Sequence, residues 1–301
     1  MANNNKSEGI KLDFFIVEAF ANQAFKGNSA AVCLIPRGQG ISSSTKQQIA
    51  SELNQPTTAF VSVINEKEAF QDAKQFALQW YSPTSESPLC GHGTLASAAV
   101  LFSIYDNCSE TLNFETARGK LTAKWLFNEK VQLDLPAYEP KSPVMEEFQV
   151  LVKAVTGSYC VQEVLLSDSK YLMIRLQDNF TRKELELLNP KEAELLAATS
   201  AIRGVIVTVK GSGMNDCLDG DGISYDFISR VFAPWRGILE DPVCGAAHCV
   251  LGSYWAKILK KSKLYARQCS PRGGELNIEV IKDRVMLSGD AFIVVKGQIN
   301  F

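Results

Sequence analysis

The chain has 301 residues, of which 31 are basic and 33 acidic, and its formal net charge is −2. This balance excludes the strongly basic surface that nucleic-acid and membrane-surface binders carry, and it favours a small-molecule partner. The polar start of the chain and the lack of a run of about 18 apolar residues predict neither a signal peptide nor a membrane span, so we expect a cytoplasmic protein. The length favours two domains.

The cysteine content does not suggest a disulfide framework, because eight cysteines are few for a chain of this size. We expect six of them to be reduced and buried, since free cysteine is among the most buried residue types. The other two, Cys90 and Cys244, lie in a motif that the chain contains twice.

The first half of the chain opens with strand-forming segments. Residues 11–20 and 29–35 are rich in aromatic and β-branched residues, and the turn sequence at 25–28 between them predicts a hairpin. Residues 93–104 predict a helix that is apolar on nearly every face, so we expect strands to surround it. Further strands are expected at 57–64, 73–81, 111–127 and 131–135.

A second helix would place a carboxylate at its end. Ser44 and Gln47, three residues apart, have the pattern of a capping box and predict a helix that stops before Pro56. Glu52 is then expected in the last turn, where the negative end of the helix dipole and apolar neighbours would raise its pKa toward neutrality. Such a pKa suits a proton carrier, although the commoner role of a lone glutamate is that of a solvated surface residue.

The second half repeats the alternation of strands and helices. Residues 135–140 contain two prolines and are expected to form the crossing between the halves. The glycines at 211–222 do not form a G-x-G-x-x-G pattern, so no nucleotide cofactor is expected. Helices are expected at 146–155 and at 183–199 with a break near Pro190, and strands at 163–166, 171–176, 205–210, 223–232 and within 263–301.

The motif E-x-P-x-C-G occurs once in each half, at 86–91 and at 240–245. Each copy follows an aromatic, strand-like segment that ends in proline, and each precedes an alanine-rich segment with helical spacing. The only two histidines, His92 and His248, come two and four residues after the two cysteines. This repetition predicts two similar halves and marks a functional site.

Each copy would present an anion-binding helix end. A helix that starts after a glycine carries unpaired N–H groups and a partial positive charge at its N-terminus. Two such ends, one with Gly91 and Gly93 and one with Gly245 and Ala246, would together bind a small carboxylate without an arginine. Glycine and proline in a simple turn would explain one copy, but not matched cysteines in both.

The paired cysteines allow a different chemistry. Cys90 and Cys244 would lie beside positively charged helix ends, which lower thiol pKa values, so the pair could act as base and acid on one carbon. As metal ligands they are unsuitable, because C-x-H and C-x-x-x-H are not usual zinc spacings, and no metal site is expected.

Four motifs in order resemble the PhzF-type family of phenazine-biosynthesis-like isomerases. They are GNSAAV at 27–32, ELNQPTTAF at 52–60, CGHGT at 90–94 and EDPVCGAAH at 240–248. FAPW at 232–235 and RGGEL at 272–276 resemble the animal members in addition, and the whole resemblance covers about residues 11–301.

The resemblance implies an α+β fold of the diaminopimelate-epimerase type. Two pseudo-symmetric halves would each wrap a mixed sheet or open barrel around a central helix, with the active site in the cleft. We expect one domain to comprise 1–137 with about 290–301, and the other to comprise 138–289. The family uses no cofactor, and a homodimer, the commonest closed assembly, is one expected oligomer.

The same resemblance assigns roles to three residues. Glu52 would be the acid/base group that moves a proton between carbons on one face of the substrate, as in isomerising a dihydro-hydroxyanthranilate. His92 and Asp241 would hold polar groups of the substrate. The family usually has T-G-S at 244–246, and the alanine at 246 removes the serine hydroxyl.

Two alternatives remain open at this point. Cys90 and Cys244 stand where related proline racemases and diaminopimelate epimerases carry a catalytic thiol pair, so the chain could be a cofactor-independent racemase or epimerase. It could also be a non-catalytic member of the family that binds a small ligand or a protein.

Overall fold

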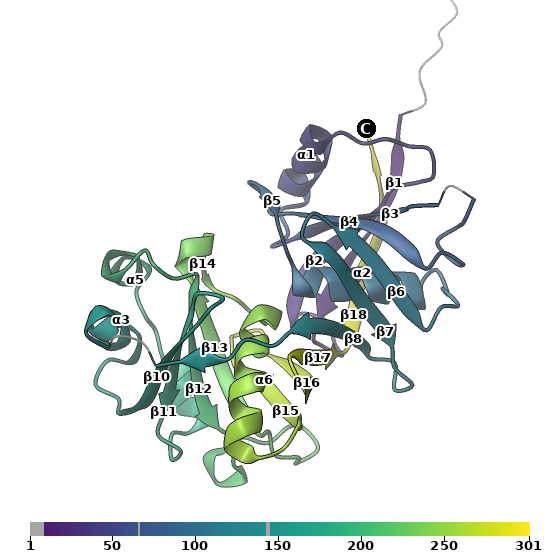
Figure 1. Ribbon diagram of the computed structural model, residues 1–301. Coiled ribbons are helices and arrows are strands. Elements are labelled where there is room, and N and C mark those ends of the chain that lie inside the picture. Colours follow the sequence, from purple (N-terminus) through teal and green to yellow (C-terminus); the bar gives the residue numbers. More distant parts are fainter. Residues whose placement is uncertain (1–8, 66, 143–144) are drawn as a thin grey trace, which may run out of the picture. The chain divides into compact units, whose positions relative to one another are not determined.

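The computed structural model describes residues 9–65, 67–142 and 145–301. These residues form two compact units (Figure 1). The first unit comprises the described residues of Met1–Ala19, Ser29–Trp125 and Ala291–Phe301, and the second comprises Phe20–Asn28 and Leu126–Asp290. In the described parts of the chain, every helix is too short or too polar to span a bilayer.

The first unit is built on a mixed sheet. β1 pairs antiparallel with β18, β2 pairs parallel with β3, and β4 pairs antiparallel with β3 and parallel with β6. Its strands are β1 (Lys11–Ala19), β2 (Asn28–Leu34), β3 (Thr58–Val63), β4 (Gln75–Tyr81), β5 (Glu86–Ser87), β6 (Thr111–Thr116), β7 (Gly119–Trp125) and β18 (Ala291–Asn300).

Helix α2 (Gly91–Ser103) is the centre of the first unit. Every residue from Gly93 to Phe102 is buried, and the helix contacts β1, β3, β7 and β18. A helix without a polar face is stable only when it is enclosed, and the expected wrapping by strands is confirmed. The helix begins at Gly91, two residues earlier than predicted, so the last residue of the motif belongs to its first turn.

Helix α1 (Ser43–Leu53) ends before Pro56, as predicted, and Glu52 lies in its last turn. Its start differs from the prediction, because the cap is Ser42, whose hydroxyl accepts the Thr45 N–H at 3.1 Å. Gln47 does not close a capping box and instead donates to the carbonyl of Ser82 at 3.0 Å. This contact ties α1 to the segment that leads into the first copy of the motif.

The second unit repeats the plan. Its central helix is α6 (Gly245–Leu259), which contacts β15, β16 and β17, and its short helices are α3 (Met145–Thr156), α4 (Arg182–Leu187) and α5 (Glu192–Ala198). The predicted break near Pro190 separates α4 from α5. Two 3₁₀ turns are η1 (Gly213–Asn215) and η2 (Pro234–Arg236). Its strands are β8 (Val131–Pro136), β9 (Pro140–Lys141), β10 (Val161–Ser167), β11 (Tyr171–Leu176), β12 (Gly204–Lys210), β13 (Phe227–Ala233), β14 (Ile238–Glu240), β15 (Lys263–Gln268), β16 (Gly274–Ile281) and β17 (Arg284–Gly289).

The sheet of the second unit is also mixed. β11 pairs parallel with β12, and β13 pairs parallel with β15, whereas β15, β16 and β17 are antiparallel neighbours. The strand expected at 223–232 begins only at Phe227, because the preceding residues form a loop. Both units therefore have a mixed sheet and one central helix, and the chain is of the α+β class.

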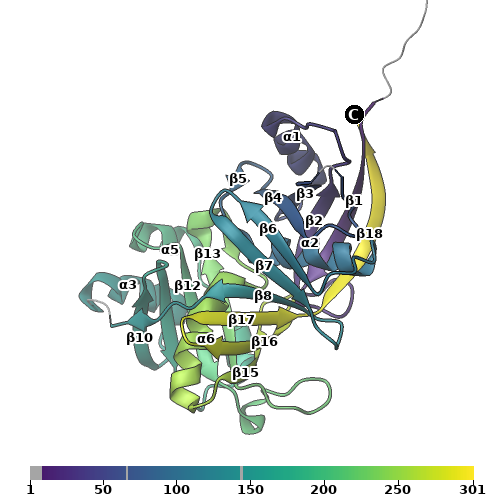
Figure 2. The same cartoon turned by 45° about the vertical axis from the view of Figure 1, so that its right-hand side comes forward.

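The boundary between the units differs from the one expected. Residues 20–28 and 126–137 belong to the second unit, so the chain crosses at Trp125 and not within 135–140. The reason is that β8 pairs antiparallel with β17, with Val131 opposite Gly289, and Figure 2 shows the two strands side by side. Local sequence did not reveal this pairing, because residues such as Asp134 and Arg284, which are hydrogen-bonded to each other, are 150 residues apart.

The cysteines follow the expectation only in part. Cys33, Cys217, Cys249 and Cys269 are buried and reduced, but Cys108 and Cys160 are exposed.

Candidate active site

The first copy of the motif turns directly into α2, with Cys90 as the N-cap residue. The thiol sulfur accepts the N–H of Gly93 at 3.4 Å, and it lies 3.3 Å from the hydroxyl of Thr57 and 3.4 Å from Nδ1 of His92. Only 8% of Cys90 is exposed. Cys90 therefore organises this helix end, while Gly91 and His92 are the residues that reach the surface.

Gly93 is required by the packing of this turn. A Cβ atom at this position would lie 2.9 Å from Cδ1 of Trp80 and 3.2 Å from the sulfur of Cys90. Trp80 is fully buried, so it has no room to move aside. The close approach keeps the start of α2 against β4 and Thr57.

Glu52 lies on the surface. Its side chain is exposed and makes no hydrogen bond or ion pair with the described residues. The expected burial of Glu52 by apolar neighbours is wrong. Ala59 and Phe60 are buried in the core on β3, and Leu53 is itself only partly buried. The turn after Glu52 is fixed by Asn54 in the left-handed conformation, with a φ of 48°.

The second copy of the motif is held by buried side chains from distant segments. Asn28 donates to the Asp241 carboxylate at 2.9 Å and to the carbonyl of Val243 at 3.0 Å. Gln268 accepts the N–H of Cys244 at 2.9 Å and donates to the carbonyl of Asp241. Asp241 is thus a buried carboxylate in a fixed orientation, and the sequence pattern did not predict Gln268.

Cys244 is the N-cap of α6 but has different surroundings from Cys90. Its sulfur lies 3.6 Å from the hydroxyl of Tyr171, which accepts a hydrogen bond from Arg236 at 3.1 Å. Burial, and then the negative charge of Asp241, raise the pKa of the Cys244 thiol to about 12. The expected lowering by the helix end is wrong for this residue, since burial outweighs the dipole.

The first turn of α6 offers a small partly exposed face. Gly245 is buried, whereas Ala246 is partly exposed, and both belong to the first turn, whose N–H groups have no carbonyl partner within the helix. The start of α6 therefore combines helix N–H groups with the Asp241 carboxylate three residues before Cys244.

The second histidine is a core residue. His248 is completely buried and its ring stacks on Phe227, with ring centroids 6.1 Å apart. Nδ1 donates to the carbonyl of Cys244 at 2.8 Å, because a carbonyl can only accept. Burial lowers the pKa of His248 to about 4. Of the two histidines near the motif, only His92 is placed to meet a ligand.

The predicted residues are divided between the two units. Glu52 on α1 and the residues from Cys90 to Gly93 at the start of α2 belong to the first unit, and Asp241 and the residues from Cys244 to Ala246 at the start of α6 belong to the second. Each of these two groups is called a half-site below. Apart from His92, the groups around the two thiols were not predicted from the sequence. Thr57 lies within the motif ELNQPTTAF at 52–60, but Tyr171 and Arg236 carried no local signal.

Known proteins resemble the chain over almost its whole length. A family model described as phenazine biosynthesis-like protein matches residues 17–297. Phenazine biosynthesis-like domain-containing protein 1 of Mus musculus is 44% identical over 97% of this chain and 100% of its own. An uncharacterized isomerase of Halalkalibacterium halodurans is 36% identical over 95% of this chain and 97% of its own.

Solved structures agree with this likeness. The crystal structure of a phenazine biosynthesis protein of the PhzF family from Enterococcus faecalis is 35% identical, has a TM-score of 0.81 and covers 96% of this chain and 99% of its own. A hydroxyproline epimerase from Agrobacterium vitis, 12% identical over 96% of this chain and 92% of its own with a TM-score of 0.54, shares the fold alone. The expected fold of the diaminopimelate-epimerase type is confirmed.

Proposed function

Because the chain belongs to the phenazine biosynthesis-like family, we propose that this isomerase moves a proton within a small carboxylate-bearing metabolite, with Glu52 as its acid/base group and no cofactor. His92 and Asp241 bind polar groups of the substrate, and the first-turn N–H groups of α2 and α6 bind its carboxylate. In this proposal the two half-sites serve one substrate.

The difference between Glu52 and Cys244 supports the carboxylate as the proton carrier. A general base must be deprotonated near neutral pH and must reach the substrate. A thiol with a pKa of about 12 is ionised in only about one molecule in 10⁵ at pH 7, and Cys244 is also buried. A thiol pair needs both cysteines to ionise in turn, whereas Glu52 is an exposed carboxylate.

The proposed step leaves the composition of the substrate unchanged. The Glu52 carboxylate removes a proton from one carbon, and the electron pair of the broken C–H bond moves into the neighbouring π system. The double bond shifts, and the Glu52 carboxyl returns the proton to a second carbon on the same face. Helix N–H groups stabilise the negative charge of the substrate without a metal ion.

The test compares Glu52→Gln, Cys90→Ser and Cys244→Ser on a dihydro-hydroxyanthranilate in D₂O, with products followed by NMR. Glu52→Gln should lower turnover by about 100-fold to 10,000-fold, the usual worth of a positioned acid/base group, and each serine variant should lower it much less. Wild-type product should carry deuterium at one position with a single configuration. Near-normal turnover by the Gln variant, with both serine variants inactive and a stereocentre inverted, would assign the reaction to the cysteines.

The same assay addresses the non-catalytic alternative. A wild-type protein that binds small cyclic carboxylates by calorimetry, yet exchanges no proton of any of them in D₂O, would be a ligand-binding member of the family.

A further inference from the structure

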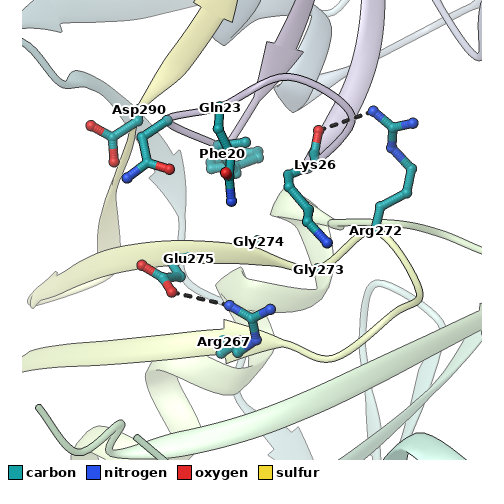
Figure 3. A pocket seen from close by; sticks show the side chains of 11 residues that line it. Phe20, Gln23, Lys26, Arg267, Arg272, Gly273, Gly274, Glu275 and Asp290 are labelled. Carbon is teal, nitrogen blue, oxygen red and sulfur yellow. Dashed lines mark hydrogen bonds and ion pairs between the residues drawn. The ribbon is translucent and has the colours of Figure 1, made fainter. Parts of the chain in front are cut away.

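The second unit contains a small cavity that includes no residue of the repeated motif. Its volume is about 60 Å³, and its walls come from the segment Phe20–Lys26, from Arg267 on β15, from Arg272–Glu275 and from Asp290 (Figure 3). The wall contains the Arg-Gly-Gly-Glu part of a motif that the proposed isomerase reaction does not use.

Two cationic side chains have donor atoms to spare in this cavity. Nζ of Lys26 makes no hydrogen bond or ion pair with the described residues. The Arg267 guanidinium also lines the cavity: its Nη1 donates to Glu275, and its Nη2 makes no hydrogen bond with the described residues.

The acidic residues of the wall already have partners. Glu275 accepts hydrogen bonds from Tyr225 at 2.5 Å, from Tyr265 at 2.7 Å and from Arg267 at 3.0 Å. Asp290 pairs with Lys130 at 3.4 Å. Arg267 therefore balances the charge of Glu275, and Lys130 balances that of Asp290 from outside the cavity. The charge of Lys26 has no such partner among the described residues, and it makes the interior attractive to an anion.

The polar side chains converge on one end of β16. Figure 3 shows Gln23 and Lys26 pointing from their segment toward Gly274 and Gly273, with Arg267 on the neighbouring strand. Gly273 has a φ of +66°, and a Cβ atom there would lie 2.6 Å from the Arg267 guanidinium. Only glycine permits both this backbone and this approach of the arginine.

The wall opposite β16 is backbone held in an unfavourable conformation. Phe20 and Phe25 have φ values of 63° and 67°, a backbone conformation that bulky residues rarely adopt. Arg272 fixes this segment by donating to the carbonyls of Gly27 at 2.9 Å and Lys26 at 3.0 Å. Such conformations persist where the surroundings impose them, often at ligand sites.

We propose that this cavity binds a phosphate group, either as inorganic phosphate or as the phosphate of a small monoester. Its 60 Å³ corresponds to roughly four to six water positions, which fits a group of five heavy atoms. Arginine and lysine are the side chains best suited to phosphate oxygens, and the Gln23 amide supplies a neutral donor. This site does not depend on Glu52 or on the isomerase reaction.

The experiment is calorimetric titration of the full chain with inorganic phosphate and, separately, with glycerol 3-phosphate, at constant ionic strength. Lys26→Gln should weaken phosphate binding about tenfold, the worth of one charge-assisted hydrogen bond, and Gln23→Ala should weaken it about threefold. Lys210→Gln is the matched control, because Lys210 is exposed, lies in the same unit and is outside the cavity. This control should bind like the wild type.

The outcomes are distinct. Tighter binding of glycerol 3-phosphate than of phosphate would identify a monoester as the ligand, and the reverse order would identify free phosphate. A wild type that shows no saturable binding of either compound overturns the proposal. Equal affinity of Lys26→Gln and Lys210→Gln overturns it as well, since the anion would then sit elsewhere, for example at a helix N-terminus. Glu52→Gln should bind phosphate normally, so a failed isomerase assay leaves this result unaffected.

Discussion

The two copies of the E-x-P-x-C-G motif form the same backbone feature but present different groups. Both place a cysteine at the N-cap of a central helix. Two residues after the cysteine, the first copy has His92 and the second has Ala246, whereas Asp241 stands in the second copy where the first has Ser87. Each loop thus supplies one polar group that the other lacks. The two copies share the cysteine N-cap at the helix start, but they carry different side chains at the positions of His92 and Asp241.

The two cysteines differ for the same reason. Cys90 is surrounded by the Gly93 N–H, the Thr57 hydroxyl and the His92 ring, whereas Cys244 is enclosed with Tyr171. An identical position at a helix end does not give identical surroundings, because these depend on the residues that the rest of the fold places there. The comparison argues against a symmetric thiol pair.

The largest expected effect is the difference in alkylation rate between Cys244 and the exposed cysteines. At pH 8 a thiol with a pKa of about 12 is ionised in about one molecule in 10⁴, compared with about a quarter for an unperturbed thiol. Cys244 should therefore react with iodoacetamide at least about 1,000-fold more slowly than the exposed Cys108 and Cys160, and its rate should rise about tenfold per pH unit. Peptide mapping by mass spectrometry measures these rates. Comparable labelling of Cys244 and Cys108 would contradict the assigned burial.

The histidines allow a test by pH. The folded-state pKa of His248, about 4, is below the unfolded value of about 6.5, so the unfolded chain binds the proton more readily. The contribution of His248 to stability is complete above about pH 6.5 and is lost as the pH falls toward 4. Between pH 7 and pH 5 the loss should be about 2 kcal/mol in the free energy of unfolding.

Urea unfolding at the two pH values measures this loss. His248→Gln, which keeps an N–H donor for the Cys244 carbonyl, should remove most of the pH dependence, whereas His92→Gln should retain it. If His92→Gln flattened the curve and His248→Gln did not, the roles of the two histidines would be reversed.

Much of the fold was predictable because it follows local patterns. The apolar run before Phe102 predicts an enclosed helix, and Pro190 predicts the break between α4 and α5. The starts of α1 and α2 were misplaced by one or two residues, because serine and glycine occur repeatedly there and several positions satisfy the cap pattern.

The candidate site was predictable only in part. The motifs identify Glu52, His92 and Asp241, but the contacts that set the character of each half-site come from far along the chain. Asn28 and Asp241 are 213 residues apart, and Tyr171 and Cys244 are 73 apart. Burial of Cys244 and exposure of Glu52 both result from tertiary packing, which periodicity and spacing do not encode.

The first turn of α2 is packed more tightly at its third residue than the first turn of α6, and Gly93→Ala tests this difference. The new Cβ atom would lie 2.9 Å from Trp80 and 3.0 Å from Thr57, whereas the equivalent residue of α6 is already Ala247. Overpacking lowers the free energy of unfolding by about 1 to 3 kcal/mol, and the better helix propensity of alanine raises it by up to about 1 kcal/mol. Urea unfolding should show a net loss of about 1 to 2 kcal/mol. A gain in stability, as at an open helical glycine, would show that Trp80 can move.

The smallest expected effect concerns the position that corresponds to His92. Ala246 is partly exposed in the first turn of α6 and lacks the hydroxyl that the family usually has there, so Ala246→Ser restores one donor beside the Asp241 half-site. If that hydrogen bond strengthens in the transition state, it is worth about 1 to 3 kcal/mol, and kcat on a dihydro-hydroxyanthranilate should rise about tenfold with little change in KM. Ala247→Ser is the control, because Ala247 is buried and its hydroxyl would meet no substrate. An Ala246→Ser variant with unchanged kcat would show that the second half-site does not lack a donor. His92 in the first loop and Asp241 in the second would then be sufficient polar groups without a hydroxyl at position 246.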